Sequence, residues 1–196
     1  MERRLRMAGL AAGMLLCLAG GAEAQQTPTA QAELTNADGK PVGTVTLTQH
    51  PKGVLIRAEL SGLPPGWHAL HVHETGKCEP PDFKSAGGHF NPQDRRHGLV
   101  QAGIHAGDLP NLHAGADGKI MAEMFTDAIR LGQQPAASPA ASADGSAVAA
   151  TTAAADILDQ DGAALVLHAG PDDYRSDPAG NSGDRIACGV IERSRR

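Results

Sequence analysis

The sequence predicts an all-β protein, and three features of the 196-residue chain support this class. Glycine and proline are plentiful, at 24 and 13 residues, which is typical of short strands joined by turns and not of a helical bundle. Several segments alternate apolar and polar residues, as half-buried strands do. Turn dipeptides such as Asp38-Gly39 and Asp117-Gly118 stand beside them. We therefore predict an eight-stranded antiparallel barrel or sandwich with long loops.

The first residues are predicted to be an export signal and not part of the fold. Three arginines in the first six residues precede an apolar run, Met7–Gly20. The small residues of Ala22–Ala24 then fit a signal-peptidase site, so we expect residues 1–24 to be cleaved. A membrane anchor is the less favoured alternative, because a spanning helix needs roughly 18–20 apolar residues.

Two details leave the export route open. Cys17 could carry a lipid, but Leu16 stands before it, where a lipoprotein signal has a small residue. The Arg3-Arg4 pair permits twin-arginine export as well as the general route. Both routes predict a periplasmic protein without stable membrane insertion. The formal charge of -5 argues against a nucleic-acid partner held by a general basic surface.

The predicted domain spans residues 31–192, after a tail at 25–30 that we expect to be flexible. Residues 32–49 give a strand, the turn at Asp38-Gly39 and a second strand. In residues 53–63, the apolar residues at even positions from Val54 to Leu60 predict one buried face. The remaining predicted strands lie in residues 67–74, 119–127, 163–170 and 185–192.

The segments between the strands are of three kinds. Residues 75–110 lack periodicity and are rich in Gly, Pro, His and Asp, and so long a loop is usually functional. Residues 132–155 are a low-complexity run of Ala, Ser and Pro, predicted to be a flexible surface insertion. A short Ala-rich helix is the alternative there. Residues 171–184 form a second polar loop, and residues 193–196 are predicted to be a basic tail.

Loss of residues 1–24 leaves two cysteines, Cys78 and Cys188. An exported protein with two cysteines is predicted to hold one disulfide. The chain-entropy model gives about 4–5 kcal/mol for a bridge that closes a loop of about 110 residues. Cys78 is therefore predicted to be a bridge partner and not a metal ligand.

Histidines gather in the long loop and in the strand before it. His71 and His73, two apart on a predicted strand, point to one face, although such a pair is also typical of a solvated strand. The loop adds three imidazoles and a carboxylate, a set that suits tetrahedral zinc; a solvated His-rich loop is the alternative. These four are His89, His97, His105 and Asp108.

His168 follows the most apolar predicted strand. A histidine there is either a hydrogen-bonded core residue or a ligand that faces a pocket. With His71 and His73 nearby in the sheet, His168 would complete a nitrogen-rich set of the kind that copper prefers.

Six segments now suggest a family: "GWHALHVHETGKC", "SAGGHFNP", "RRHG", "IHAGDL", "LVLHAGPDDY" and "GNSGDRIACGVI". By these segments the chain resembles the copper/zinc superoxide dismutase family in its exported bacterial form, from Ala32 to Glu192 apart from the insertion. The resemblance implies a Greek-key barrel with a metal-binding loop and an electrostatic loop. It implies an enzyme that converts superoxide to O₂ and hydrogen peroxide, with one copper ion and one Zn²⁺ per subunit. A dismutase-like copper/zinc-binding protein without turnover is the alternative.

The resemblance also assigns roles to single residues. The implied copper ligands are His71, His73, His89 and His168, and the implied zinc ligands are His89, His97, His105 and Asp108. His89 would bridge the two ions and act in proton transfer. Asp172 would link His71 to His97, and Cys78 would pair with Cys188. Arg185 would lie beside the copper.

The substrate implied by the resemblance is an anion, and the chain is acidic, so the overall charge of the protein repels the substrate. Attraction must therefore be local, from the metal ions and Arg185. Lys84 and Arg175 are candidates to assist, the alternative being that both are ordinary exposed cations. The resemblance permits a homodimer but does not require one.

Overall fold

The computed structural model describes residues 29–132 and 154–194. The predicted signal peptide, most of the predicted tail and most of the predicted insertion lie outside the described residues. Within them, no helix is long and apolar enough to cross a membrane.

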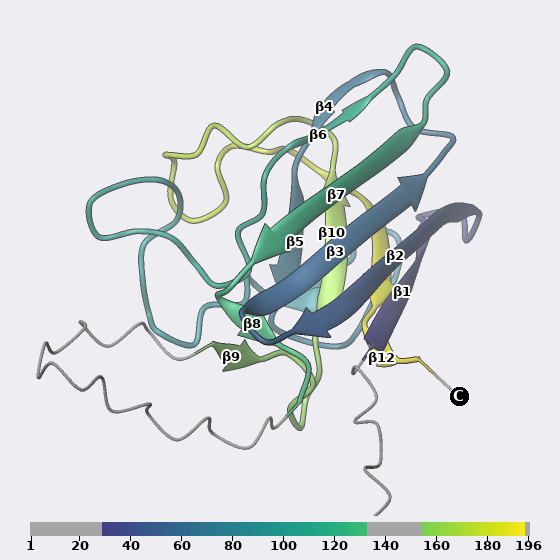
Figure 1. Cartoon of the computed structure of the whole chain (residues 1–196). Helices are drawn as coiled ribbons and strands as arrows, with labels where there is room; N and C mark the ends of the chain where they lie inside the picture. The colour runs from purple at the N-terminus through teal and green to yellow at the C-terminus, as the bar shows by residue number, and fades with distance from the viewer. Residues whose placement is uncertain (1–28, 133–153, 195–196) are drawn as a thin grey trace, which may run out of the picture.

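The fold is a curled antiparallel sheet, which confirms the predicted all-β class (Figure 1). Seven strands follow the order β5-β10-β11-β1-β2-β3-β7, and β12 pairs with β1 as the eighth. The sheet strands are β1 (Thr29–Asn36), β2 (Pro41–His50), β3 (Gly53–Leu60), β5 (Leu70–His73), β7 (Ile120–Thr126), β10 (Ala164–His168), β11 (Arg185–Val190) and β12 (Glu192–Arg193).

Four further strands form two small pairs beside the main sheet. These are β4 (Gly66–His68) with β6 (Leu112–Ala114), antiparallel, and β8 (Ile129–Arg130) with β9 (Ala155–Asp156), parallel. One short 3-10 turn, η1 (Lys84–Ala86), lies in the long loop. After β3 the chain crosses to β5 at the far edge of the sheet, returns to β7 beside β3, and crosses again to β10.

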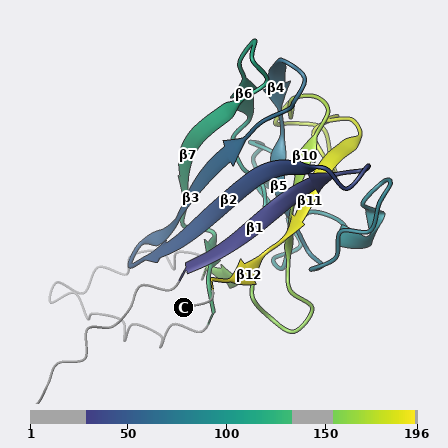
Figure 2. The ribbon, with the colours of Figure 1, turned by 90° about the vertical axis from the view of Figure 1, so that its right-hand side faces the viewer.

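Alternation along the strands explains which face is buried. In β2 and β3 the buried residues pair across the strands, with Val45 opposite Ala58 and Leu47 opposite Ile56. Their neighbours point to the outer face, which Figure 2 shows as the broad surface of β7, β3, β2 and β1. The main hydrophobic core therefore lies inside the curl of the sheet.

The strands β5 and β10 differ because both of their faces are buried. Leu70 and Val72 of β5 join the main core. His71 and His73 point to the opposite face, where they lie opposite Val166 and Ala164 of β10. The long loops cover this face, so the two histidines are buried outside the barrel interior.

A second, small core lies under the long loop. Phe83 and Ala86 of the loop pack there against Ala164 and Val166, beside Cys188. The bond between Cys78 and Cys188, with an S–S distance of 2.03 Å, confirms the predicted disulfide. The long loop is thus fixed to β11 both by the bridge and by apolar packing.

Several predicted boundaries need correction. Thr29 and Ala30 belong to β1 and not to a tail, and Ala30 is fully buried. Arg193 belongs to β12, where it pairs with Ala30, and not to a free tail. Ala155, predicted to lie within the insertion, belongs to β9.

The predicted strand over residues 67–74 is broken at Ala69 into β4 and β5. Trp67, at the start of the predicted strand, is 56% exposed and contacts the ring of the exposed His113. The break lets His68 turn inward, where both of its ring nitrogens lie 2.8 Å from backbone carbonyl oxygens of Pro64 and His168. These two contacts give His68 a structural role.

Candidate metal centre

Two sheet strands and one loop bring the first group of histidines together. His71 and His73 come from the outer face of β5, and His168 comes from the end of β10. The register between β10 and β11 shifts between Leu167 and His168. A bulge of this kind re-aims the side chain that follows it, and it turns His168 toward His71, with ring centroids 5.0 Å apart.

The loop supplies the fourth member of this group. His89 forms an isolated β-bridge with His73, and its ring centroid lies 4.0 Å from that of His71. One nitrogen from each of His71, His73, His89 and His168 falls within 4.8 Å of the others, and all four residues are buried. We name these four residues the imidazole cluster.

A second group shares His89 with the first. One ligand atom from each of His89, His97, His105 and Asp108 lies within 4.8 Å of the others, and we name these four the carboxylate cluster. Asp108 is held by β-bridge pairing with His71 and accepts hydrogen bonds from the amides of Gly98 and His105.

His89 presents a different ring nitrogen to each cluster. Its Nδ1 lies 2.9 Å from Asp108 Oδ1 and 3.5 Å from His105 Nδ1, on the side of the carboxylate cluster. Its Nε2 is buried and has no hydrogen-bond partner among the described residues. One imidazole ring thus stands between the two clusters, with a nitrogen directed to each.

The other rings of the imidazole cluster each have one nitrogen held by the protein. Nδ1 of His73 lies 3.0 Å from the Gly87 carbonyl oxygen, and Nδ1 of His168 lies 3.2 Å from that of Gly183. Since a carbonyl only accepts, these nitrogens carry the proton. The Nε2 atoms keep their lone pairs and are buried without a partner among the described residues.

Asp172 connects the clusters on a second path. Its Oδ2 lies 2.9 Å from His71 Nε2, and its Oδ1 lies 3.0 Å from His97 Nε2. The carboxylate therefore orients one ring of each cluster and leaves both Nδ1 atoms directed inward. His97 Nδ1 lies 3.1 Å from Asp108 Oδ1 without hydrogen-bond geometry, as expected for two atoms that face a common cation.

The buried ring nitrogens without hydrogen-bond partners in the described part of the chain, here called orphaned nitrogens, indicate whether metal ions fit the site. Five buried ring nitrogens lack hydrogen-bond partners among the described residues, which is costly unless another group binds them. An all-imidazole set suits copper, and three imidazoles with a carboxylate suit zinc. The residues present therefore fit one ion in each cluster.

The protonation states also suit metal binding. Burial is the main cause that lowers the pKa of His71, His73 and His105, and it lowers the pKa of His168 to about 3. Burial alone would raise the pKa of Asp108, but the His89 hydrogen bond and the Gly98 amide lower it to about 2. At neutral pH the four rings are neutral and the carboxylate is ionised, as metal ligands must be.

Arg185 lies at a hollow beside the imidazole cluster. It is the cross-strand partner of His168, and its guanidinium donates to the carbonyls of Phe83 (2.8 Å) and Gly87 (2.7 Å). Gly87 thereby holds both Arg185 and His73. The hollow, about 530 Å³, is lined by Pro81, Asp82, Lys84, Gly183, Asp184 and Arg185.

The two other candidate cations are placed differently. Lys84 lines the same hollow, where its ammonium lies 2.8 Å from the Asp82 carboxylate. Arg175 is exposed and is not among the residues that line the hollow. His50 and His113 lie outside both clusters and are exposed.

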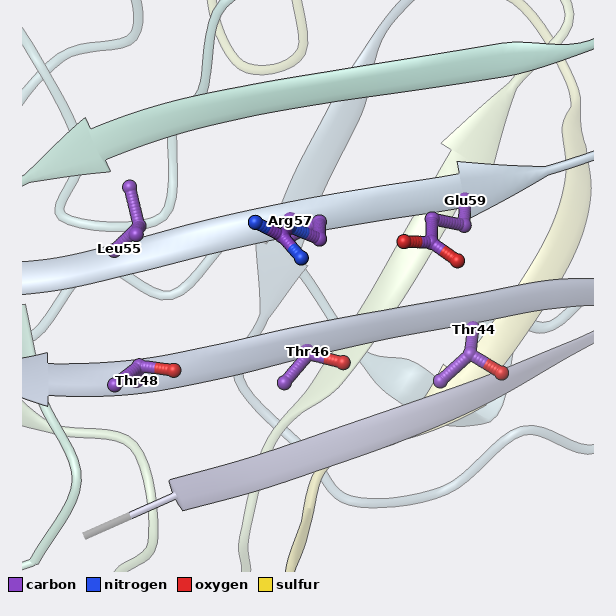
Figure 3. Close-up of a pocket in the computed structure, with 6 residues that line it drawn as sticks. All are labelled: Thr44, Thr46, Thr48, Leu55, Arg57 and Glu59. Atoms are coloured by element: carbon purple, nitrogen blue, oxygen red, sulfur yellow. The ribbon is translucent and has the colours of Figure 1, made fainter. Parts of the chain in front are cut away.

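A further hollow, of about 350 Å³, lies on the outer face of β2 and β3 (Figure 3). Threonines from β2 and the side chains of Leu55, Arg57 and Glu59 from β3 line it. It contains none of the predicted site residues, and Arg57 is engaged with Glu123 at 2.6 Å. This face carries ordinary solvated strand residues.

Sequence reasoning missed the groups that hold the predicted residues in place. The carbonyls of Gly87 and Gly183 are invisible to side-chain motifs, because any residue could supply them. Asn111 exchanges two hydrogen bonds of 2.8 Å with the backbone of Asp172, and the amide of Asn111 donates to the Tyr174 hydroxyl. No motif marked Asn111, and Tyr174, although it ends the segment "LVLHAGPDDY", was given no role.

The fold and the paired clusters define a metalloprotein with two adjacent metal sites on the outer face of a β-barrel. A model of the copper/zinc superoxide dismutase family matches residues 41–191. The chain belongs to the copper/zinc superoxide dismutase family, which is a family of oxidoreductases that use both metals.

Individual relatives agree with this family. The chain is 41% identical to Cu-Zn superoxide dismutase 2 of Aquifex aeolicus, over 95% of this chain and 98% of the relative. Solved structures include a SOD-like protein from Bacillus subtilis (39% identity, TM-score 0.69, covering 82% of this chain and 96% of that one). Cu/Zn superoxide dismutase from Brucella abortus also matches (30% identity, TM-score 0.61, covering 84% and 99%).

Proposed function

We propose that this chain dismutates superoxide with copper in the imidazole cluster and zinc in the carboxylate cluster. The observation that carries the proposal is His89, whose two nitrogens face different clusters. Two superoxide anions and two protons give one O₂ and one hydrogen peroxide. Copper, when bound, supplies the one-electron redox chemistry, and zinc, which has none, supplies charge and structure.

The chain's own residues supply binding, orientation and proton transfer. His71, His73 and His168 would hold a copper ion through ring nitrogens, because Asp172, Gly87 and Gly183 fix the opposite nitrogens of these rings. His89 Nε2 takes up a proton and returns it to the peroxide, which is general acid catalysis. Arg185 attracts and orients the anion in the hollow that it lines.

The same proposal covers export. We infer that residues 1–24 are a signal peptide and that the mature protein begins at Gln25 and acts in the periplasm, where it would protect the cell envelope. The basic start, apolar run and small residues at Ala22–Ala24 support this. An intact mass of the protein from a periplasmic extract should correspond to residues 25–196; a full-length mass would contradict it.

We also propose that the protein forms a homodimer. Two exposed apolar side chains, Leu99 and Ile104, border one hollow of about 330 Å³ next to Asp108. Burying the same apolar patch of a second copy is the usual route to a symmetric pair. Light scattering should give a dimer mass that Leu99→Ser converts to a monomer; a monomer in the unmodified protein would contradict the proposal.

The decisive experiment measures metal content and activity on one preparation. Elemental analysis should find copper and zinc in near-equal amounts, about one of each per chain, and a cytochrome c competition assay should show superoxide removal. Copper-loaded protein without activity would instead favour a dismutase-like metal-binding protein. Absence of bound copper would contradict both the superoxide dismutase and the copper/zinc-binding protein without turnover.

A further inference from the structure

Tyr174 connects three segments that surround the carboxylate cluster, and the function above does not use it. It is the one tyrosine of the chain. Its amide donates to Asp172 Oδ1 at 2.6 Å, its carbonyl accepts from the amide of Leu99 at 2.8 Å, and its hydroxyl accepts from the amide of Asn111 at 2.7 Å. One residue thus joins the second polar loop, the long metal loop and the segment before β6.

The hydroxyl acts on Asp172 through Asn111. The Asn111 side chain donates to the Asp172 carbonyl and accepts from the Asp172 amide, both at 2.8 Å. This reciprocal pair fixes the backbone of Asp172, and the Tyr174 hydroxyl fixes the backbone of Asn111. Without the hydroxyl, a half-buried amide would lose its acceptor, and the pair would lose its support.

The backbone at Tyr174 shows that these contacts determine its conformation. Its φ of 56° lies in the left-handed region, which is unfavourable for a non-glycine residue. The close approach of its carbonyl also restricts the long metal loop, since a Cβ on Gly98 of that loop would lie 2.4 Å from the Tyr174 carbonyl oxygen. Residues held in this way persist where the surroundings over-determine them.

The two clusters depend on this connection to different degrees. Asp172 Oδ1, which accepts from the Tyr174 amide, is the oxygen that holds His97. His97 lies in a loop, whereas His71 lies in β5 and is fixed by the strand pairing with β10. Loosening Asp172 should therefore disturb the carboxylate cluster more than the imidazole cluster.

We propose that Tyr174 is a positioning residue for the carboxylate cluster: its hydroxyl keeps Asn111 and Asp172 in place and thereby aims His97. The assignment of zinc to that cluster rests on the proposed function, but the hydrogen-bond path does not. Partners that orient metal-bound histidines typically change metal affinity by 10-fold or more when removed.

The test is Tyr174→Phe, which keeps the ring and removes only the hydroxyl. We expect zinc to transfer to a chromogenic chelator about tenfold faster than from the unmodified protein, while copper retention changes less than about twofold. Asn111→Ala should have the same effect, and the double variant should be no worse than either single one, since both act on one path. Arg175→Ala, an exposed neighbour, serves as the control.

A second readout uses the metal-free protein and so separates this inference from the assignment of metals. Amide hydrogen exchange at Asn111 should be about tenfold faster in Tyr174→Phe, with β1–β3 unchanged. Unchanged zinc transfer and unchanged exchange at Asn111 would overturn the inference. Equal acceleration of zinc and copper loss, with faster exchange throughout the sheet, would overturn it too, because it would indicate general destabilisation.

Discussion

At the scale of single residues, the histidines of the site divide their two ring nitrogens between two tasks. In His73 and His168, the ring nitrogen that donates to a backbone carbonyl fixes the tautomer and the plane of the ring. The opposite nitrogens are left with lone pairs in buried positions. His89 is different, because both of its nitrogens face a cluster, and this makes it the residue on which the proposed proton transfer depends.

Arg185 gives the first prediction at this scale. Arg185→Ala should lower kcat/KM at low ionic strength by about tenfold or more and should weaken its salt dependence, since local positive charge raises the encounter rate of an anion. Copper content should not change, because Arg185 contacts two carbonyls and none of the orphaned nitrogens. Stopped-flow kinetics at several salt concentrations would measure both effects.

Arg57→Ala is the matched control for that experiment. It removes the same charge, but from the outer hollow on β3 shown in Figure 3. A steering role specific to Arg185 requires that the rate of Arg57→Ala stay near that of the unmodified protein. Equal losses in both variants would indicate an effect of net charge, and no loss in Arg185→Ala would refute the role.

At the scale of elements, β8 and β9 show how the chain on either side of the low-complexity run is anchored. They pair in parallel, Ile129 with Ala155 and Arg130 with Asp156. The Gly132 amide donates to Asp156 at 2.7 Å, and the Leu131 amide donates to the buried Gln49. Together with the guanidinium of Arg130, which donates to the Ala154 carbonyl, these bonds tie both ends to the barrel.

The low-complexity run between these anchored ends is expected to have no catalytic or metal-binding role. Residues 133–153 should be replaceable by a Gly-Ser linker of about eight residues without loss of activity or metal content, because they supply no predicted ligand. A linker is needed because parallel strands cannot be joined by a tight turn. A flexible chain of that length spans roughly 15 Å.

The matched comparison replaces residues 132–155 with the same linker. This variant also loses the Gly132 and Ala155 contacts, so its thermal midpoint should fall below that of the first variant. Calorimetry and the activity assay would separate the two. A large loss of activity in a folded variant lacking only residues 133–153 would show that the run has a function.

At the scale of the whole molecule, the site makes stability depend on pH when no metal is bound. Burial lowers the pKa of His71, His73, His105 and His168, the last to about 3, whereas an unfolded chain has its histidine pKa near 6.5. Between those values the unfolded state binds more protons. The free energy of unfolding must therefore fall as pH decreases below about 6.5.

We predict that urea unfolding of the metal-free protein, with the disulfide intact, shows this decline from pH 7 to pH 4.5. Each coupled proton contributes a slope of about 1.4 kcal/mol per pH unit. His168→Asn should have a shallower slope than the unmodified protein, and His113→Asn, at an exposed site, should not. Stability that is constant or rises toward low pH would contradict the assignment of neutral buried rings.

Much of this protein was determined by the sequence alone, where the information is local. Strand periodicity in β2 and β3, the turn at Asp38-Gly39 and the two mature cysteines each predict a structure from neighbouring residues or simple counting. The family motifs added Asp172 and Arg185. The predicted metal ligands do come together, although they extend from His71 to His168 along the chain.

Only the tertiary structure decided how the site is held. The bulge at His168, the carbonyls of Gly87 and Gly183 and the links from Tyr174 to Asn111 and Asp172 involve backbone groups or uncommon contacts. Backbone amides and carbonyls are the same in every residue, so no side-chain pattern identifies which of them will meet an imidazole. The sequence specifies the ligating atoms, whereas the fold determines their orientation and burial.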